Sequence, residues 1–341
     1  MAVRADVFAA ARLFAFAAAL FLTPAAAAAQ SQHPVRVYVT NEDDGTVSVI
    51  DAATNRVIHR LRVGTGPRGI EAGPNGRVFV ALSDTMRQAA SDADAIAEID
   101  VAAPRLIARH RVGTDPEEFA LSPDGRRLYA SNEDAGTASV IDLGTREVLA
   151  TLTVGIEPEG VAASPDGRWV YVTAETSNTI SVIDTRTNTV AASFLVDVRP
   201  RGVVFSPDSR RAYVSNEISG TISVIDVSIH DVIDVIDLAP GAKPVGLAVS
   251  PDGARLYAAL GAQHAVAVVD TRTLATLATI PVGRRPWGVG LDAEGARLYT
   301  ANGVSNDVSV IDTQALREIA RIPVGNGPWG IAVARHPAPS E

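Results

Sequence analysis

Cysteine is absent from this chain of 341 residues. Its absence excludes a disulfide framework, a thiolate metal site, a C-x-x-C-H haem attachment and a lipoprotein attachment site. The six histidines form no H-x-x-H or H-E-x-x-H pair, and the chain has no G-x-S-x-G or Walker motif. The folded domain must therefore be stable through packing alone, and about 310 residues can bury enough surface for that.

Basic charge and long apolar runs are also scarce. The formal net charge is −9, which argues against nucleic acid or an anionic lipid surface as a partner. The one long apolar run, residues 13–22, follows Arg4 and Arg12 and precedes an Ala-rich segment. This pattern predicts a secretory signal over residues 1–29 and a periplasmic or secreted protein. The run is too short for a membrane span, although an uncleaved anchor helix is the alternative.

One sequence repeat occurs seven times between residues 35 and 334. It reads Pro-x-Gly, an apolar run, Ser-Pro-Asp-Gly, Tyr-Val-x-Asn, a polar turn, Val-Ser-Val-Ile-Asp and Val-Gly. The aspartates that end its Ile-Asp or Val-Asp unit are spaced by 42 to 49 residues: Asp51, Asp100, Asp142, Asp184, Asp226, Asp270 and Asp312. A period near 42 with several short apolar runs is typical of β-propeller blades.

The repeat that opens at Pro158 shows how one blade forms. Four runs of strand-forming residues are separated by turns. The first turn is Ser-Pro-Asp-Gly, in which proline fixes one φ, aspartate bonds to its own backbone and glycine adopts a positive φ. The chain begins with a second-type strand from Val35 and ends with a first-type strand near Ile331. These two half-repeats complete one blade. We therefore predict an all-β, seven-bladed propeller of four-stranded antiparallel blades, closed by its terminal strands, in a single domain over residues 30–341.

Tyr38-Val39-Thr40-Asn41 and its counterparts resemble the YVTN family of β-propeller repeats over residues 35–334. Residues 157–160, 199–202, 215–220, 285–288 and 301–309 more closely resemble an exported seven-repeat propeller associated with pyrroloquinoline quinone (PQQ)-dependent alcohol catabolism. The resemblance implies a periplasmic accessory role beside quinoprotein dehydrogenases and c-type cytochromes. It implies no known reaction and no bound cofactor of its own, although a contact with PQQ is compatible with it.

Strand alternation places the Val-Gly-x-x-Pro loops and the Asn-Glu-x-x-Gly turns on one face of the ring. The residue after each repeat proline then lies at the mouth of the central channel, where charge alternates with indole. These residues are Arg68, Glu117, Glu159, Arg201, Val245, Trp287 and Trp329. We expect Arg68 to neighbour Glu117, Glu159 to neighbour Arg201, and the two tryptophans to be in adjacent blades.

Two interpretations of this mouth stay open. It can bind a planar, anionic or carbonyl-rich small molecule or a partner side chain, because indoles stack and arginine pairs with carboxylates. Alternatively, the tryptophans plug the channel and the charges neutralise one another. His264 is the one histidine expected in a loop on the mouth face, and it is included among the candidate binding residues.

Other features carry weaker hypotheses. One repeat has eight extra residues between Ser83 and Ala95, on the mouth side, where either a functional loop or a tolerated insertion fits. The acidic turns at residues 41–45 and 132–134 do not have the spacing of an EF-hand, so we interpret them as solvated turns and predict no metal site.

Three functions are compatible with this pattern. The first is a non-enzymatic, monomeric accessory that binds a periplasmic protein, such as a quinoprotein dehydrogenase or cytochrome, or a small ligand. The second is a lactonase-like hydrolase, in which Glu117, Glu159, Arg201 and His264 would activate water. The third is a purely structural propeller. The fold alone does not choose among them.

Overall fold

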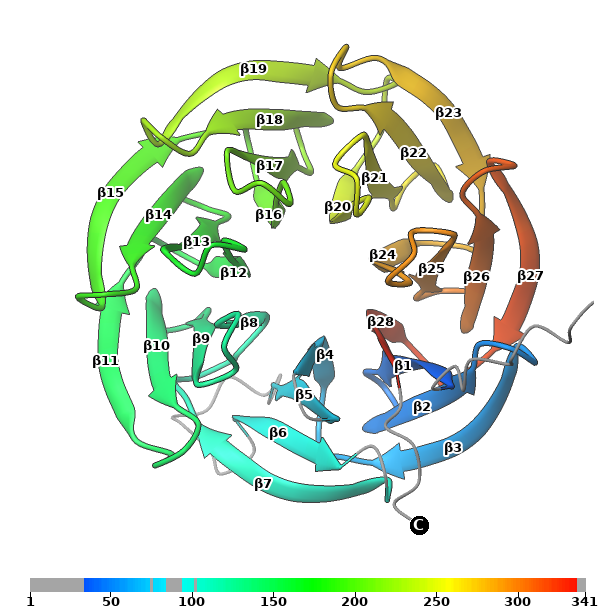
Figure 1. Ribbon diagram of the computed structural model, residues 1–341, viewed down its shortest axis with the longest axis horizontal. Coiled ribbons are helices and arrows are strands. Elements are labelled where there is room, and N and C mark those ends of the chain that lie inside the picture. Colours follow the sequence, from blue (N-terminus) through cyan, green and yellow to red (C-terminus); the bar gives the residue numbers. More distant parts are fainter. Residues whose placement is uncertain (1–33, 74–75, 84–93, 101–102, 336–341) are drawn as a thin grey trace, which may run out of the picture. The chain divides into compact units, whose positions relative to one another are not determined.

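The structure is a computed structural model that describes residues 34–73, 76–83, 94–100 and 103–335. It consists of seven four-stranded antiparallel sheets arranged as a ring around a central axis (Figure 1). The predicted seven-bladed propeller is thus confirmed. The predicted signal over residues 1–29 and most of the insertion after Ser83 lie outside the described residues. No helix within the described part of the chain could cross a membrane.

The four strands of each blade succeed one another from the axis to the rim, except that the last blade takes its innermost strand from the end of the chain (Figure 1). The innermost strands are β4 (Pro67–Gly73), β8 (Phe119–Leu121), β12 (Pro158–Ala163), β16 (Pro200–Phe205), β20 (Pro244–Val249), β24 (Pro286–Leu291) and β28 (Pro328–Arg335). The second strands are β5 (Arg77–Leu82), β9 (Arg127–Asn132), β13 (Trp169–Ala174), β17 (Arg211–Asn216), β21 (Arg255–Leu260), β25 (Arg297–Asn302) and β1 (Val35–Asn41).

The third and outermost strands complete the blades. The third strands are β6 (Ala95–Asp100), β10 (Thr137–Asp142), β14 (Thr179–Asp184), β18 (Thr221–Asp226), β22 (Ala265–Asp270), β26 (Asp307–Asp312) and β2 (Thr46–Asp51). The outermost strands are β7 (Arg105–Arg111), β11 (Val148–Thr153), β15 (Thr189–Leu195), β19 (Asp231–Asp237), β23 (Thr276–Pro281), β27 (Arg317–Pro323) and β3 (Arg56–Arg62). The second and third strands are buried on both faces because each blade lies between two others.

The terminal strands close the ring as the half-repeats predicted. β1 pairs antiparallel with β28, so that Val37 faces Val333 and Val39 faces Ile331. The hydroxyl of Thr40 accepts a hydrogen bond from the Gly330 N–H at 2.8 Å and donates one to the Arg68 carbonyl at 2.7 Å. One side chain of the closing blade therefore bonds to its own innermost strand and to that of the next blade.

The repeated asparagine after each Tyr-Val-x segment has a structural reason. Asn41 is fully buried, and its Nδ2 donates to the Ser48 hydroxyl at 3.0 Å. Its Oδ1 accepts from the Gly325 N–H, in the loop that enters the blade, at 3.0 Å. Asn132 makes the equivalent bonds to Ser139 and Gly113. This amide satisfies buried polar groups at the mouth end of the blade, where a β-turn begins.

The opposite end of the blades has its own connection. Arginines at the start of four second strands donate to backbone carbonyls in the neighbouring blade, for example Arg297 to the Ala52 carbonyl at 2.6 Å. Trp169 takes the arginine's position in one blade and packs edge-on against His230, 4.5 Å between ring centroids. His230 also shares a 2.7 Å hydrogen bond with the Tyr171 hydroxyl. His230 therefore has a packing role away from the mouth.

Candidate functional site at the channel mouth

Each blade presents three residues to the mouth. One precedes the proline of the innermost strand, one follows it, and one follows the second strand, because these three points of the chain meet at the same end of the sheet. By blade they are Gly66, Arg68 and Ser83; Asp115, Glu117 and Glu133; Glu157, Glu159 and Glu175; Arg199, Arg201 and Glu217; Lys243, Val245 and Gly261; Arg285, Trp287 and Gly303; Gly327, Trp329 and Glu42.

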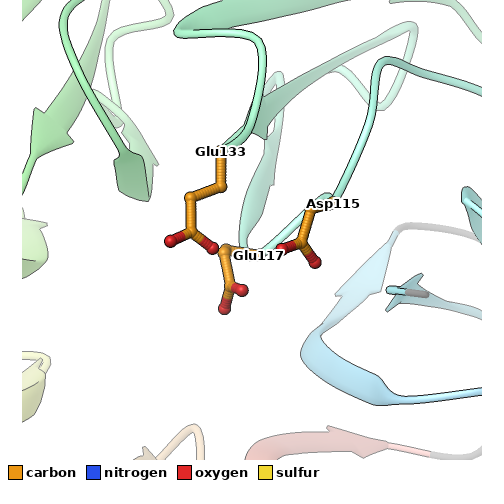
Figure 2. A group of neighbouring side chains, drawn as sticks. All are labelled: Asp115, Glu117 and Glu133. Atoms are coloured by element: carbon orange, nitrogen blue, oxygen red, sulfur yellow. The ribbon is translucent and has the colours of Figure 1, made fainter. Parts of the chain in front are cut away.

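Two adjacent blades contribute only carboxylates. We call their six residues the acidic wall: Asp115, Glu117, Glu133, Glu157, Glu159 and Glu175. In the first of these blades, carboxylate oxygens of Asp115, Glu117 and Glu133 all lie within 4.8 Å of one another. Figure 2 shows the three side chains side by side at the inner end of this blade. Carboxylate oxygens are the ligands that hard divalent cations prefer.

Arg68 borders the acidic wall on one side. It forms an ion pair with Glu117, and its Nε donates to Glu42 Oε1 at 2.9 Å. Its Nη1 also lies 3.9 Å from Asp115. Glu117 is 2% exposed, so its charge has little water and depends on this guanidinium. The structure thus brings together the predicted Arg68–Glu117 pair and adds two carboxylates that the Pro-x-Gly positions did not indicate.

Arg199 and Arg201 border the acidic wall on the other side. Arg201 pairs with Glu159 at 2.5 Å and also with Glu175. Arg199 lies 2.9 Å from Glu175 and 3.3 Å from Glu217. The predicted Arg201–Glu159 pair is therefore part of a larger network in which Arg199 contacts two carboxylates and Arg201 three, the third being Glu217 at 3.9 Å.

The tryptophans form the indole wall, which consists of Trp287 and Trp329. Their rings lie 6.3 Å apart, centroid to centroid, with 18° between the planes. The Arg285 guanidinium lies 4.3 Å above the Trp287 ring, within range of a cation–π interaction. The predicted adjacency of the two indoles is present in the structure. They narrow one side of the channel without filling the mouth.

Two cavities lie along the axis. The mouth cavity has a volume of about 450 Å³ and is lined by the acidic wall, by Glu42, Arg68, Arg199 and Arg201, and by both tryptophans. The channel cavity, about 180 Å³, is lined by Glu118, by the innermost strands and by the same indoles. The site has features of both alternatives. It has room for a ligand, as the binding interpretation expects, and its arginines form ion pairs with some of its carboxylates, as the other interpretation expects.

Two carboxyl groups here are strongly perturbed. Burial raises the pKa of Glu133 to about 7, with help from the negative charges of Glu159 and Asp115 and against the influence of Arg68. Burial raises the pKa of Glu118 to about 8, again reinforced by Glu159 and by Glu71. A carboxyl with a pKa near neutrality can accept or release a proton at physiological pH, which is what acid–base catalysis requires.

Glu118 occupies a position that is glycine in the other six repeats. Those glycines let innermost strands approach closely; a Cβ at Gly160, for instance, would lie 2.1 Å from the Arg201 carbonyl oxygen. The Glu118 carboxyl lies beside Gly69 of the neighbouring blade, where an added Cβ would be 2.5 Å from its Oε2. The one departure from the glycine pattern therefore introduces a titratable group into the channel.

His264 lies outside this arrangement. It is exposed in the turn between β21 and β22, and its Nδ1 accepts a hydrogen bond from the Arg285 N–H at 3.1 Å. It is not among the residues that line either cavity. Its turn follows the second strand and is on the mouth side of the blade, but its side chain bonds to the loop that contains Arg285 instead of lining the cavity.

Glu133, Glu175, Glu217 and Glu42 were not predicted as site residues. The acidic turns that contain Glu42 and Glu133 were interpreted as solvated, yet both side chains line the mouth cavity. Their position immediately after the second strand, on the same face as the Pro-x-Gly loops, was the available signal. Asp115 precedes the repeat proline, and this position also varies between charged residues and glycine among the repeats, a signal of the same kind as that of the residue after the proline.

Comparisons with known proteins agree with the fold. The family model for the seven-bladed β-propeller lactonases matches residues 197–326, and that for the cytochrome D1 haem domain matches residues 92–194. No curated protein matches the chain. The chain is a β-propeller, and its closer resemblance to the PQQ-associated propellers stays a prediction.

Solved structures share this architecture. One is Kuenenia stuttgartiensis hydrazine synthase, 22% identical with a TM-score of 0.73, covering 81% of this chain and 92% of that one. Proteins from Bacteroides fragilis and Bacteroides uniformis, provisionally described as 6-phosphogluconolactonases, are 18% and 19% identical. Their TM-scores are 0.75 and 0.73, covering 89% of this chain and 99% and 100% of theirs. At these identities the likeness establishes the fold alone.

Proposed function

We propose that the protein is a lactonase-like hydrolase that opens a lactone ring in the mouth cavity. The observation that carries the proposal is Glu133, a carboxyl with a pKa of about 7 beside a cavity that also contains arginines and stacked indoles. The partial match to the lactonase family supports it. This reverses the order of the functions expected from the sequence, where a non-enzymatic accessory came first.

The chemistry follows from the charges at the mouth. Glu133 makes no ion pair with the described residues, so its carboxylate is available to take a proton from a water molecule. The water oxygen adds to the lactone carbonyl carbon, and the guanidinium of Arg68 or Arg201 stabilises the negative charge that develops on the carbonyl oxygen. The ring C–O bond then breaks, and the leaving alkoxide takes the proton from Glu133. The product is the open hydroxy acid.

The test is acid release from glucono-δ-lactone in a pH-stat, corrected for spontaneous hydrolysis. We expect Glu133→Gln to lower kcat by at least about 100-fold, the usual contribution of a positioned general base. Glu147→Gln, an exposed residue of an outer turn, removes the same charge and is the matched control. Turnover that survives Glu133→Gln would reject this base. No turnover of any lactone by the unaltered protein would reject the hydrolase.

The accessory role predicted from the PQQ-associated resemblance is the second candidate. Four exposed aliphatic side chains lie on mouth-side loops and favour a protein partner: Ile156, Val198, Ile218 and Val304, 46–61% exposed. A photo-crosslinker at Val304 is expected to capture a periplasmic partner, such as a quinoprotein dehydrogenase or cytochrome. The matched position is Ile229, 63% exposed in a turn on the opposite face. Capture from Ile229 alone would contradict the docking surface.

A further inference from the structure

The mouth cavity carries a large excess of negative charge. Its lining includes seven carboxylates and three arginines, a formal excess of four negative charges. The six carboxylates of the acidic wall belong to two adjacent blades, so this charge is concentrated on one side. Even with Glu133 half protonated near neutral pH, the excess remains at least three. Because part of the lining is buried, water and salt screen this excess charge less than they would screen the same charge on an exposed surface.

The arginines at the mouth are already engaged. Arg68 contacts Glu42 and Glu117, and Arg201 contacts Glu159 and Glu175. Arg199 divides its contacts between Glu175 and Glu217. A phosphate or carboxylate on a ligand would have to displace one of these carboxylates, which would leave a buried charge without its partner. One arginine can polarise a lactone carbonyl while it keeps its ion pairs, but it cannot also neutralise a dianion.

The remaining basic residues of the mouth do not change this balance. Lys243 is exposed and does not line the cavity. Arg285 lies over the Trp287 ring and 3.4 Å from Glu217. The side of the cavity opposite the carboxylates is instead the indole wall, whose two nearly parallel rings both line the cavity. The Trp287 ring already has a second guanidinium near it, that of Arg201 at 5.7 Å. Indole faces attract cations and stack on planar or apolar ring faces.

We propose that the mouth selects uncharged or cationic lactones and rejects phosphorylated and carboxylated ones. This inference rests on the proposed hydrolase function and names its substrate class. The ring of the lactone stacks on Trp287 and Trp329, and its carbonyl is directed to the acidic wall and its bordering arginines. The two Bacteroides proteins of the same fold are named for a phosphorylated lactone; the charge of this mouth assigns the present protein a different class.

The experiment compares two substrates that differ only in a phosphate, glucono-δ-lactone and 6-phosphoglucono-δ-lactone. We expect kcat/KM for the uncharged lactone to exceed that for the phosphorylated one by at least tenfold, with a smaller ratio in 0.5 M NaCl. Glu157→Gln removes one charge of the acidic wall and is expected to reduce the ratio at least threefold. Glu147→Gln removes an exposed charge outside the mouth and should leave the ratio unchanged. Equal or preferred turnover of the phosphorylated lactone would overturn the inference and leave the hydrolase standing.

Binding separates the charge preference from catalysis. Benzyltrimethylammonium and benzylsulfonate share an aromatic ring and carry opposite charges. We expect the cation to quench tryptophan fluorescence and raise the melting temperature, with weaker binding to Glu157→Gln, and the sulfonate to do neither. If the cation binds, the sulfonate does not and neither lactone is hydrolysed, the proposed hydrolase function is rejected while the cation-selective mouth is supported. Binding of the sulfonate as tight as that of the cation would overturn the selectivity itself.

Discussion

Replacing Glu118 with glutamine is expected to stabilise the protein at alkaline pH. The carboxyl pKa is raised from 4.5 to about 8 by burial and by the charges of Glu159 and Glu71. Between these pH values the folded protein holds a proton that the unfolded chain has released, so the free energy of unfolding falls as pH rises. Glu71, whose pKa burial raises to about 7, acts in the same direction. The wild-type protein should therefore lose stability from pH 5 to pH 9.

The size of the effect follows from the pKa. At about 1.4 kcal/mol per pH unit, the change at Glu118 corresponds to at most roughly 5 kcal/mol. Its side chain still borders the channel cavity, where water screens the charge, so we expect about 1–3 kcal/mol. Glu118→Gln should recover this amount at pH 9 and have little effect at pH 5.

Urea denaturation midpoints at both pH values measure the difference, provided that the m-value is unchanged. Glu147→Gln, which removes an exposed charge, is the control for net charge. The reasoning would be refuted by a Glu118→Gln midpoint that moves with pH as steeply as that of the wild type. A variant less stable than wild type at pH 9 would show that the carboxylate is favourably solvated in the channel.

Two further predictions concern the indole wall and the repeated asparagine. Trp287→Ala removes one of two stacked rings and should raise KM for a lactone about fivefold, as expected for an aromatic contact of about 1 kcal/mol. An unchanged KM in the pH-stat assay would place the ligand elsewhere. Asn41→Ala leaves the buried Gly325 N–H and Ser48 hydroxyl without their partner, and should cost about 2–4 kcal/mol of unfolding free energy. Urea midpoints measure it against the exposed control Gln314→Ala, and equal midpoints for the two variants would contradict this role.

The fold could be predicted because the same pattern of turn-forming and strand-forming residues occurs in seven successive repeats. The Ser-Pro-Asp-Gly turn of the blade that opens at Pro158 forms as expected: Ser164 donates to Asp166 at 2.6 Å and Gly167 has φ 71°. Ring closure followed from counting strands, since a half-repeat at each end has no other partner. These features depend on short-range pattern and on topology, both of which a repeat makes visible.

The site was predictable only at positions that vary where the repeat is otherwise constant. Arg68, Glu117, Trp287 and their counterparts were found because they follow the invariant proline. Glu133 was not, since an acidic residue after a strand is usually a solvated turn, and only the assembled ring shows that the turn faces the axis. The pKa of Glu133 is raised by burial in the assembled ring and by the charges of Glu159, in β12 of the next blade, and Asp115, in the loop before β8, and no local pattern contains that information.

The pH dependence of lactone hydrolysis tests the central claim most directly. For the wild-type protein, kcat/KM for glucono-δ-lactone should rise with pH through an apparent pKa of about 7, the pKa of Glu133 in the folded protein, because the carboxylate form is the base. In Glu133→Gln this limb should disappear together with the activity. A limb near pH 7 that persists in the variant, or hydrolysis that never exceeds the spontaneous rate, would contradict the account.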